Sequence, residues 1–304
     1  MVTPKILLIA LGVIIVVFLG ILVGLIINDG QKHPKWGSET YQIYSSPPNG
    51  VNESPRITLV TLTSPSRFDP SMEHISKSIR SLRRWKGLEN APSIIVADAI
   101  KPKTKYSKTK YAAYLAKLKE KVLRGEAPFH ATTLLLANQW TGPNQNIGKA
   151  VSLVGTPYLY SNQHDLVFDG EKMSKLISFD DFAKHMEKDS SLDYIVFRRQ
   201  NVHPSVVEGW FEPTSSPAPS LLPIKRAYGW SDADHVAKTS YWKIKMMPWL
   251  PTNPKLFPED HLHPTIKACR KDETCLGSKL HGAGQNLYVW DEPMVVHLDG
   301  QSKL

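Results

Sequence analysis

The sequence has little cysteine and lacks the common glycine-rich motifs of nucleotide-binding and hydrolytic enzymes. Two cysteines in 304 residues cannot build the disulfide framework of a miniprotein. There is no G-x-G-x-x-G after a strand, no G-x-x-x-x-G-K-[ST] and no G-x-S-x-G. The sequence therefore lacks the usual signatures of dehydrogenases, P-loop proteins and hydrolases. Cys269 and Cys275 also lack the C-x-x-C spacing of a structural zinc site.

The composition is that of a chain with a packed core. Hydrophobic residues make up 41% and charged residues 21%, which excludes a disordered or fibrous protein. The net charge is +9. Part of it comes from a basic run that either attracts phosphate or an anionic membrane surface, or forms a solvated face. The run consists of Lys101, Lys103, Lys105, Lys108 and Lys110.

Residues 6–27 form an uncharged apolar run near the N-terminus. At about 1.5 Å per residue, a helix of this length spans a hydrocarbon core of about 30 Å. A cleavable signal peptide is the alternative, but its apolar core is usually shorter and ends in small residues. Here Asn28 and Asp29 follow directly. We therefore predict a retained transmembrane helix.

The flanking charges do not decide the orientation of this helix, because Lys5 faces only Lys32 and Lys35. Asn52 begins an N-x-[ST] sequon, which favours a lumenal side. Cys269 and Cys275 either close a short disulfide loop there or are buried thiols. We expect a type II single-pass protein of the Golgi or endoplasmic reticulum. Its predicted parts are a cytosolic tail (1–5), the transmembrane helix (6–27), a stem rich in proline (28–55) and a folded domain (56–304).

The folded domain begins with alternating strand and helix patterns. Short β-rich runs at 57–63, 93–97, 131–137 and from 158 onward are separated by helical periodicity at 71–85, 107–124 and 146–154. Such alternation predicts βαβ crossovers and a mostly parallel, doubly wound α/β sheet. A helix at 179–188 and a strand at 194–198 follow. The region up to Pro264 is irregular, and its tryptophans either stack on sugars or fill the core. They are Trp210, Trp230, Trp242 and Trp249.

Polar residues at strand ends are the first candidates for a site, because open parallel sheets bind ligands beyond the carboxyl ends of their strands. Asp98 ends the second strand of the folded domain, and Gln163-His164-Asp165 ends the fourth. Glu259-Asp260 lies in the later loop region, and His297 follows the last apolar run.

In order and context, these residues resemble those of GT-A glycosyltransferases of the family 2 type, over residues 56–299. The resemblance implies a Rossmann-like GT-A fold, a nucleotide-sugar donor and a divalent cation, Mn²⁺ or Mg²⁺. Asp98 would contact the base, Gln163, His164 and Asp165 would bind the nucleotide sugar, and Asp165 and His297 the metal. Asp260, with Glu259 beside it, would be the general base. Trp230, Asp232 and His235 lie where acceptor-binding residues often sit.

The chemistry explains why these residue types are needed. A diphosphate leaving group develops negative charge, which a hard cation held by a carboxylate neutralises. The acceptor hydroxyl must lose a proton, which a carboxylate such as Asp260 can take, and this single displacement inverts the anomeric centre. The chain departs from the acidic D-x-D pattern at Gln163 and His164, and glutamine is a weak ligand for a hard metal.

Two other functions stay open. A degenerate GT-A domain could serve as a membrane-tethered carbohydrate-binding or partner protein, which the neutral Gln163 favours. A metal hydrolase is the third possibility, although Pro264 limits a strand through the histidines that it needs. Its ligands would be Asp260, His261, His263 and His281. Nucleic acid is not an expected partner of a lumenal domain.

Overall fold

The computed structural model describes residues 41–47, 55–64, 71–100, 107–200, 222–227, 233–252 and 286–298. The chain falls into two units, 1–36 and 37–304, and all described residues belong to the second. The membrane span predicted at 6–27 lies outside the described residues. Within them, no helix combines the length and the apolar character needed to cross a membrane.

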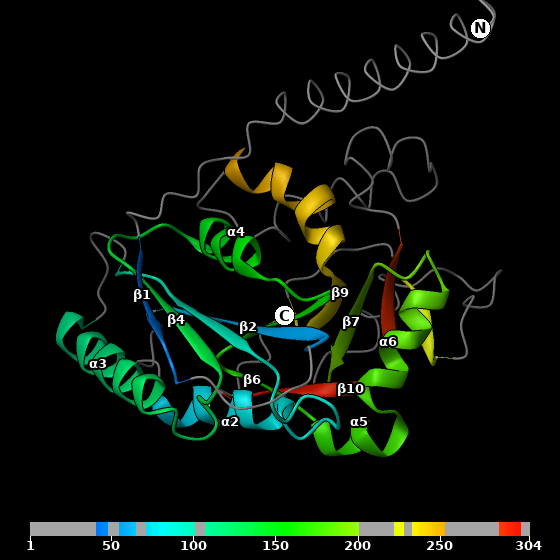
Figure 1. The fold of residues 1–304 in the computed structure, drawn as a ribbon, viewed down its shortest axis with the longest axis horizontal. Coiled ribbons are helices and arrows are strands. Elements are labelled where there is room, and N and C mark those ends of the chain that lie inside the picture. The colour runs from blue at the N-terminus through cyan, green and yellow to red at the C-terminus, as the bar shows by residue number, and fades with distance from the viewer. Residues whose placement is uncertain are drawn as a thin grey trace, which may run out of the picture. The chain divides into compact units, whose positions relative to one another are not determined.

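The described elements follow the alternation that the sequence predicts (Figure 1). The strands are β1 (Tyr41–Ser45), β2 (Ile57–Thr63), β3 (Ser93–Ala97), β4 (Thr132–Ala137), β5 (Tyr158–Gln163), β6 (Leu166–Phe168), β7 (Tyr194–Arg199), β8 (Ile224–Arg226), β9 (His235–Lys238) and β10 (Leu287–His297). The helices are α2 (Met72–Leu82), α3 (Lys108–Arg124), α4 (Pro143–Leu153), α5 (Gly170–Leu176) and α6 (Phe179–Lys188), followed by a π-helical segment η2 (Tyr241–Met246) and a 3₁₀ segment η3 (Met247–Thr252).

Local sequence accounts for where the helices begin and end. The hydroxyl of Ser71 accepts a hydrogen bond from the backbone of Glu73 at the start of α2. Ser107 caps α3 in the same way, and α3 ends at Gly125, whose φ of 62° is the left-handed conformation that glycine adopts without strain. The apolar faces predicted from periodicity are buried.

The strands form one ten-stranded sheet in the order β1-β4-β3-β2-β5-β9-β7-β10-β6, with β8 also paired to β10. The pairs β2–β3, β3–β4, β2–β5 and β7–β10 are parallel. The others are antiparallel, and β9 runs against both β5 and β7. The doubly wound α/β sheet is confirmed, but it is mixed and not mostly parallel, because short return strands fill its edges and its middle.

The predicted stem at 28–55 is too long, because part of it is a strand. Residues Tyr41–Ser45 form β1, which pairs antiparallel with β4 at the edge of the sheet. Only its first residue is buried, and the others are exposed or partly exposed, so apolar periodicity does not indicate a strand there. The folded domain therefore includes residues before 56.

Helices cover both faces of the sheet. In Figure 1, α4 and the η2–η3 segment lie on one face, and α2, α5 and α6 lie on the other. An aromatic cluster fills the second layer around Trp85, whose ring centroid lies 5.3–6.0 Å from those of four phenylalanines. They are Phe168, Phe179, Phe182 and Phe197. Burying rings of this size supplies much of the driving force for folding.

The buried side chain of Arg83 connects the loop before β3 with the loop before β4. The guanidinium of Arg83 donates hydrogen bonds of 2.8–3.0 Å to four backbone carbonyls, and only 7% of the residue is exposed. The carbonyls belong to Glu89 and Ala91 in the loop before β3, and to Pro128 and His130 in the loop before β4. Burial lowers the pKa of Arg83 to about 10, which leaves it charged at neutral pH.

We expect Arg83→Met to lower the free energy of unfolding by about 3 kcal/mol, because four carbonyls lose their donor while most of the aliphatic volume remains. Urea denaturation of both proteins measures the change. The matched control is Arg84→Met, since exposed Arg84 pairs only with Glu171 among the described residues and should contribute less than about 0.5 kcal/mol. Equal effects of the two substitutions would contradict this role of Arg83.

Candidate functional site

The carboxyl ends of the parallel strands collect the candidate residues at one edge of the sheet. The strands β2 and β5 are neighbours, but the chain continues from them in opposite directions along the sheet: β2 leads to β3 on one side, and β5 leads to β6 and β7 on the other. Their carboxyl ends therefore form a topological switch point. Asp98 follows β3, and Asp165 follows β5. Arg199 ends β7, His297 ends β10, and β9 starts at this edge because it runs the other way.

Asp98 holds the loop between β4 and α4. Its Oδ1 accepts hydrogen bonds from the backbone of Ala99 and from the backbone and hydroxyl of Thr141, at 2.8–3.2 Å. Its Oδ2 accepts from the backbone of Gly142 at 3.0 Å. Burial raises the pKa of Asp98, and these bonds oppose the shift. The carboxylate predicted to contact a base is therefore engaged within the chain, and its role toward a nucleotide stays a prediction.

The same loop is tied to the edge strand β1. The hydroxyl of Tyr41 lies 2.9 Å from Oδ1 of Asn146 in α4 and 3.4 Å from Oγ1 of Thr141. Burial raises the pKa of Tyr41 to about 12, so it stays a neutral donor. Together with Asp98, this network fixes the start of α4 beside the switch point.

The turn after β5 is held by backbone bonds at the switch point. Ser78 donates to the carbonyl of Gln163 at 3.2 Å, and the backbone of His164 donates to the carbonyl of Leu62 in β2 at 3.0 Å. Burial lowers the pKa of His164, which is 7% exposed, so its imidazole is neutral at pH 7. Asp165 comes next, where the chain leaves this turn.

The register of β6 with β10 brings Asp165 and His297 together. Leu166 pairs with His297, and the backbone of Leu298 donates to the carbonyl of Asp165 at 2.9 Å. As a result, Nε2 of His297 lies 3.5 Å from Oδ2 of Asp165. These two residues were predicted from sequence as a metal pair, and the fold places them side by side although 132 positions separate them in the chain (297 − 165).

The donor atoms of this pair, a carboxylate and an imidazole, can bind a divalent cation. Oδ1 of Asp165 is buried and has no hydrogen-bond partner among the described residues, which leaves a carboxyl oxygen available. One carboxylate and one imidazole match a cation that takes its remaining ligands from phosphate oxygens and water. No cluster of three or more His, Cys, Asp or Glu side chains able to hold a metal occurs among the described residues.

Asp234 is a buried carboxyl group that the sequence analysis did not select. It directly precedes β9, is 0% exposed, and accepts a hydrogen bond from the hydroxyl of Tyr160 at 3.1 Å on Oδ2. Its Oδ1 has no partner. Burial raises its pKa to about 8, the Tyr160 bond and Arg199 lower it, and Asp165 raises it. Nε of Arg199 is also buried without a partner.

His235 and Trp242 lie in the core. His235 is 1% exposed, its Nδ1 lies 2.7 Å from the carbonyl of Ala233, and its ring packs against Tyr194 and Trp242 at centroid distances of 4.5 and 5.7 Å. Burial lowers its pKa to about 4. The acceptor-binding role predicted for His235 gains no support from this position. Trp242, 1% exposed, fills the core and offers no surface to a sugar.

Several predicted residues lie outside the described part of the chain. They are the candidate bases Glu259 and Asp260, the acceptor residues Trp230 and Asp232, the cysteines Cys269 and Cys275, the sequon Asn52, and the hydrolase ligands His261, His263 and His281. Their roles stay predictions.

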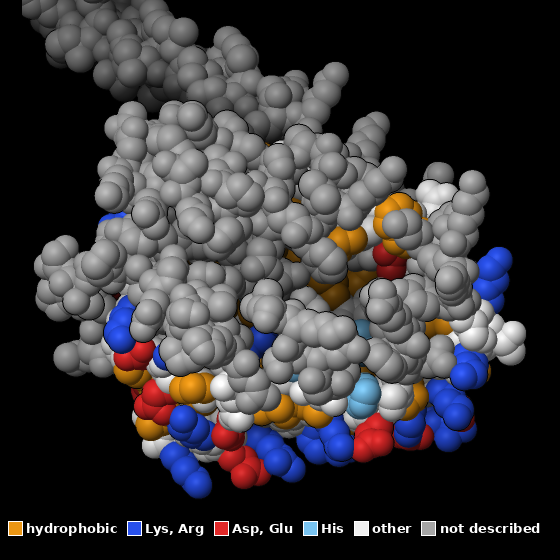
Figure 2. Space-filling view, turned by 180° about the vertical axis from the view of Figure 1, so that it is seen from behind, with side chains coloured by type: hydrophobic (Ala, Val, Ile, Leu, Met, Phe, Trp, Pro, Cys, Tyr) orange, Lys and Arg blue, Asp and Glu red, His pale blue; other side chains and the backbone are white. Residues whose placement is uncertain are grey.

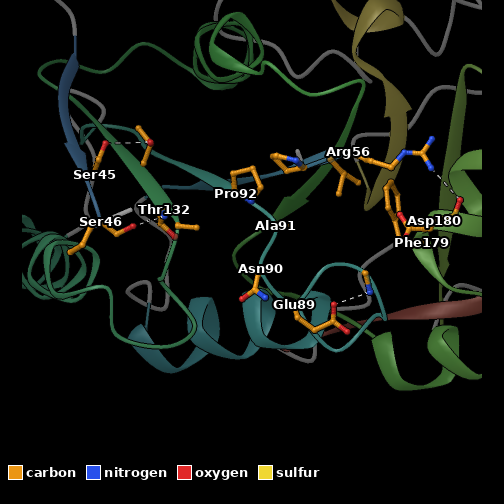
Figure 3. Close-up of a pocket in the computed structure, with 16 residues that line it drawn as sticks. Ser45, Ser46, Arg56, Glu89, Asn90, Ala91, Pro92, Thr132, Phe179 and Asp180 are labelled. Atoms are coloured by element: carbon orange, nitrogen blue, oxygen red, sulfur yellow. Dashed lines mark hydrogen bonds between the residues drawn. The ribbon is translucent and has the colours of Figure 1, made fainter. Parts of the chain in front are cut away.

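A groove of about 490 Å³ lies at the opposite edge, where β2, β3 and β4 begin (Figure 3). Ala91 and Pro92 lie in its middle, between Ser45 and Ser46 on one side and Phe179 on the other. Three charged side chains line it: Arg56 pairs with Glu187, Glu89 accepts from the backbone of Gly87 at 2.8 Å, and Asp180 is the third.

Figure 2 shows Lys and Arg side chains interspersed with Asp and Glu along the margin of the described surface that faces the viewer. The positive charge is not gathered into one patch on that part of the surface. Lys108 and Lys110 of the predicted basic run lie exposed at the start of α3, and the other three lysines are outside the described residues.

The sequence matches no protein-family model and no curated protein. Among solved structures, S. aureus TarS 1–349 is similar at a TM-score of 0.44 and 12% identity, over 80% of this chain and 60% of that one. Mannosyltransferase PcManGT from Pyrobaculum calidifontis, in complex with GDP-Man and Mn²⁺, is similar at 0.40 and 10%, over 70% and 51%. GalNAc-T7 with UDP, GalNAc and Mn²⁺ is similar at 0.46 and 9%, over 79% and 42%. Each match spans less than two thirds of the solved chain, and likeness of this degree does not establish an activity.

The buried carboxyl of Asp234 predicts a pH dependence of stability. Its pKa is about 8 in the folded chain against an ordinary 3.8. Between these values the folded state keeps a proton that the unfolded state has lost, so stability falls as pH rises, by up to ~1.4 kcal/mol per pH unit. The groups that set this pKa are Tyr160 of β5, Arg199 of β7 and Asp165 of the turn. We expect Asp234→Asn to remove this decline, measured by urea denaturation at pH 5, 6 and 7. Parallel profiles for both proteins would contradict it.

Proposed function

We propose that this chain is a nucleotide-sugar-dependent glycosyltransferase of GT-A type, which transfers a sugar to a glycan or glycoconjugate hydroxyl. One observation carries the proposal: within the part of the chain that the structure describes, three buried polar atoms of residues at the switch-point edge have no hydrogen-bond partner. They are Oδ1 of Asp165, Oδ1 of Asp234 and Nε of Arg199. A buried polar group without a partner costs about 1–3 kcal/mol or more, and such groups are explained when a ligand satisfies them.

The residues at this edge match the parts of a nucleoside diphosphate sugar. Arg199 offers a planar guanidinium, which suits phosphate oxygens. Asp165 and His297 would hold a divalent cation, Mn²⁺ or Mg²⁺. That cation, when bound, neutralises the negative charge of a diphosphate leaving group. Asp98, Gln163 and His164 line the neighbouring strand ends, where the nucleoside would lie.

The proposed reaction is a single displacement with inversion. The acceptor hydroxyl oxygen forms a bond to the anomeric carbon, while the bond from that carbon to the diphosphate oxygen breaks and the electron pair leaves with the diphosphate. Asp260, or Glu259 beside it, takes the hydroxyl proton. Trp230 and Asp232 are the proposed acceptor contacts. A buried site shields these charges from water and so strengthens each electrostatic contact.

A degenerate GT-A domain that binds carbohydrate or a partner without catalysis is the second candidate. Gln163 is neutral at the position where the related pattern has an acid, and the carboxylate of Asp98 is already engaged by four hydrogen bonds. Both features weaken ligand binding without removing the fold.

The activity gives a direct test. We expect the full chain to hydrolyse UDP- or GDP-sugars slowly in the presence of Mn²⁺ and EDTA to suppress this. Asp165→Ala should lower the rate by roughly 10²–10³-fold, as expected when an electrostatic group that stabilises the leaving diphosphate is lost. The control is Asp181→Ala, since Asp181 is exposed and pairs with Lys184 on α6. Coupled assay of released nucleoside diphosphate measures each rate.

The outcomes separate the two candidates. A wild-type chain that binds no nucleoside diphosphate, with or without Mn²⁺, would falsify the glycosyltransferase proposal. Binding without hydrolysis or transfer, together with full cellular function of Asp165→Ala, would favour the degenerate domain.

We also propose a type II orientation in the secretory pathway, supported by the apolar run at 6–27 and the sequon at Asn52. The protein expressed in animal cells should stay in the membrane pellet after carbonate extraction. It should also lose the mass of one glycan on treatment with peptide N-glycosidase, and Asn52→Gln should abolish that shift. Release of the chain by carbonate, or an absence of glycan in wild type, would contradict the membrane or the lumenal part of the proposal respectively.

A further inference from the structure

Asp234 occupies an unusual position in the sheet. It stands at the start of β9, the antiparallel strand inserted between β5 and β7. The backbone of Phe197 in β7 donates to its carbonyl at 2.8 Å, and Tyr160 in β5 donates to its Oδ2 at 3.1 Å. Both neighbouring strands therefore fix the residue, and its side chain cannot move out to solvent without breaking these bonds.

The contacts around Asp234 do not offset the free-energy cost of burying a carboxyl group. The side chain is 0% exposed, and Oδ1 has no hydrogen-bond partner. Burial raises the pKa of Asp234 by more than the Tyr160 hydrogen bond and the positive charge of Arg199 lower it, and the negative charge of Asp165 adds to the rise. Buried carboxyl oxygens are usually satisfied by hydrogen bonds. Asp193, at the opposite edge, shows that pattern: Lys238, Lys245 and Asn286 contact its oxygens at 2.8–3.4 Å.

Two carboxylate oxygens without partners thus belong to neighbouring parts of one edge, Oδ1 of Asp165 and Oδ1 of Asp234. Asp234 precedes His235, which pairs with Ser161, so Asp234 stands beside the end of β5 from which the Asp165 turn departs. Gln163, also at that end, brings no charge. A divalent cation held by Asp165 and His297 alone would have a single anionic protein ligand. Magnesium and manganese keep bound waters, and carboxylates beyond the ligands accept hydrogen bonds from them.

We propose that Asp234 is the second carboxylate of the cation site: its Oδ1 accepts a hydrogen bond from cation-bound water, and the nearby cation favours the ionised form of the carboxyl group, which then supplies the negative charge that Gln163 lacks. The inference rests on the proposed function, because it assumes that a cation and a nucleoside diphosphate bind at Asp165 and His297. Asp234 is a positioning residue, since it acts through the cation and its water and does not contact the reacting atoms. Oδ1 of Asp234, which has no hydrogen-bond partner among the described residues, is the acceptor that such a water would need.

The test compares the full-length chain in detergent as wild type, Asp234→Asn and Asp193→Asn. Asparagine keeps the shape of the side chain and the acceptor for Tyr160 but removes the charge. Mn²⁺ binding is titrated by electron paramagnetic resonance of free Mn²⁺, with UDP or GDP present and absent, and unfolding midpoints are measured by urea denaturation. We expect Asp234→Asn to weaken Mn²⁺ binding in the presence of the diphosphate by at least tenfold, with an unfolding midpoint that is unchanged or raised. Asp193→Asn should do the reverse and lower the midpoint while leaving Mn²⁺ affinity within twofold of wild type.

The alternative results overturn the proposal in distinguishable ways. Wild-type Mn²⁺ affinity in Asp234→Asn removes Asp234 from the cation site and leaves the proposed function standing. A joint loss of affinity and stability in that variant assigns Asp234 to the core only. An equal loss of Mn²⁺ affinity in Asp193→Asn would mean that the loss of one negative charge from the protein, and not the position of Asp234, weakens Mn²⁺ binding. If wild type binds neither Mn²⁺ nor its complex with UDP or GDP, the proposed function itself fails, and the inference with it.

Discussion

The direction of six strands governs the arrangement of the candidate site. The strands β2, β3, β4, β5, β7 and β10 run the same way, so the residues that follow them meet at one edge although they are scattered along the chain. β9 runs the opposite way between β5 and β7, and therefore contributes the residues at its beginning to the same edge. A single reversed strand thus places Asp234 between two elements that carry candidate ligands. Without it, β5 and β7 would be direct neighbours, and no carboxyl group would enter from that side.

Charged side chains are buried at both edges of the sheet, and they differ in how many partners they have. At the amino edge, Arg83 and Asp193 are each surrounded by several partners, so burial costs little and the loops between strands are fixed. At the carboxyl edge, Oδ1 of Asp165 and Oδ1 of Asp234 have no hydrogen-bond partner among the described residues, and at the amino edge the same holds for Oδ2 of Asp189, which precedes β7. The contacts of Arg83 and Asp193 stabilise the fold, and the oxygens without partners at the carboxyl edge are those that the proposed cation and its waters would satisfy.

The sequence predicted the parts of this site that depend on local pattern. Asp98, Asp165 and His297 were found because each follows an apolar run that reads as a strand, and in a parallel sheet such residues share an edge. Asp234 was missed because it precedes its strand, and only the pairing of β9 with β5 and β7 shows that this strand is reversed. β1 was missed because an edge strand of five mostly exposed residues has no apolar period. His235 was selected because it lies where acceptor-binding residues often sit in the enzymes that the sequence resembles, yet packing between Tyr194 and Trp242 buries it, which spacing along the chain cannot reveal.

The pairing of β1 has a mechanical consequence. β1 is antiparallel to β4, so Tyr41 lies opposite Ala137 at the carboxyl edge. A force applied at Tyr41 along β1 would load the ladder of β1 with β4 in shear, in which several hydrogen bonds share the load. The hydroxyl of Tyr41 is bonded to Asn146, which also accepts a hydrogen bond from Thr141 in the loop that Asp98 holds. Such a force is therefore transmitted to the loop beside the candidate site.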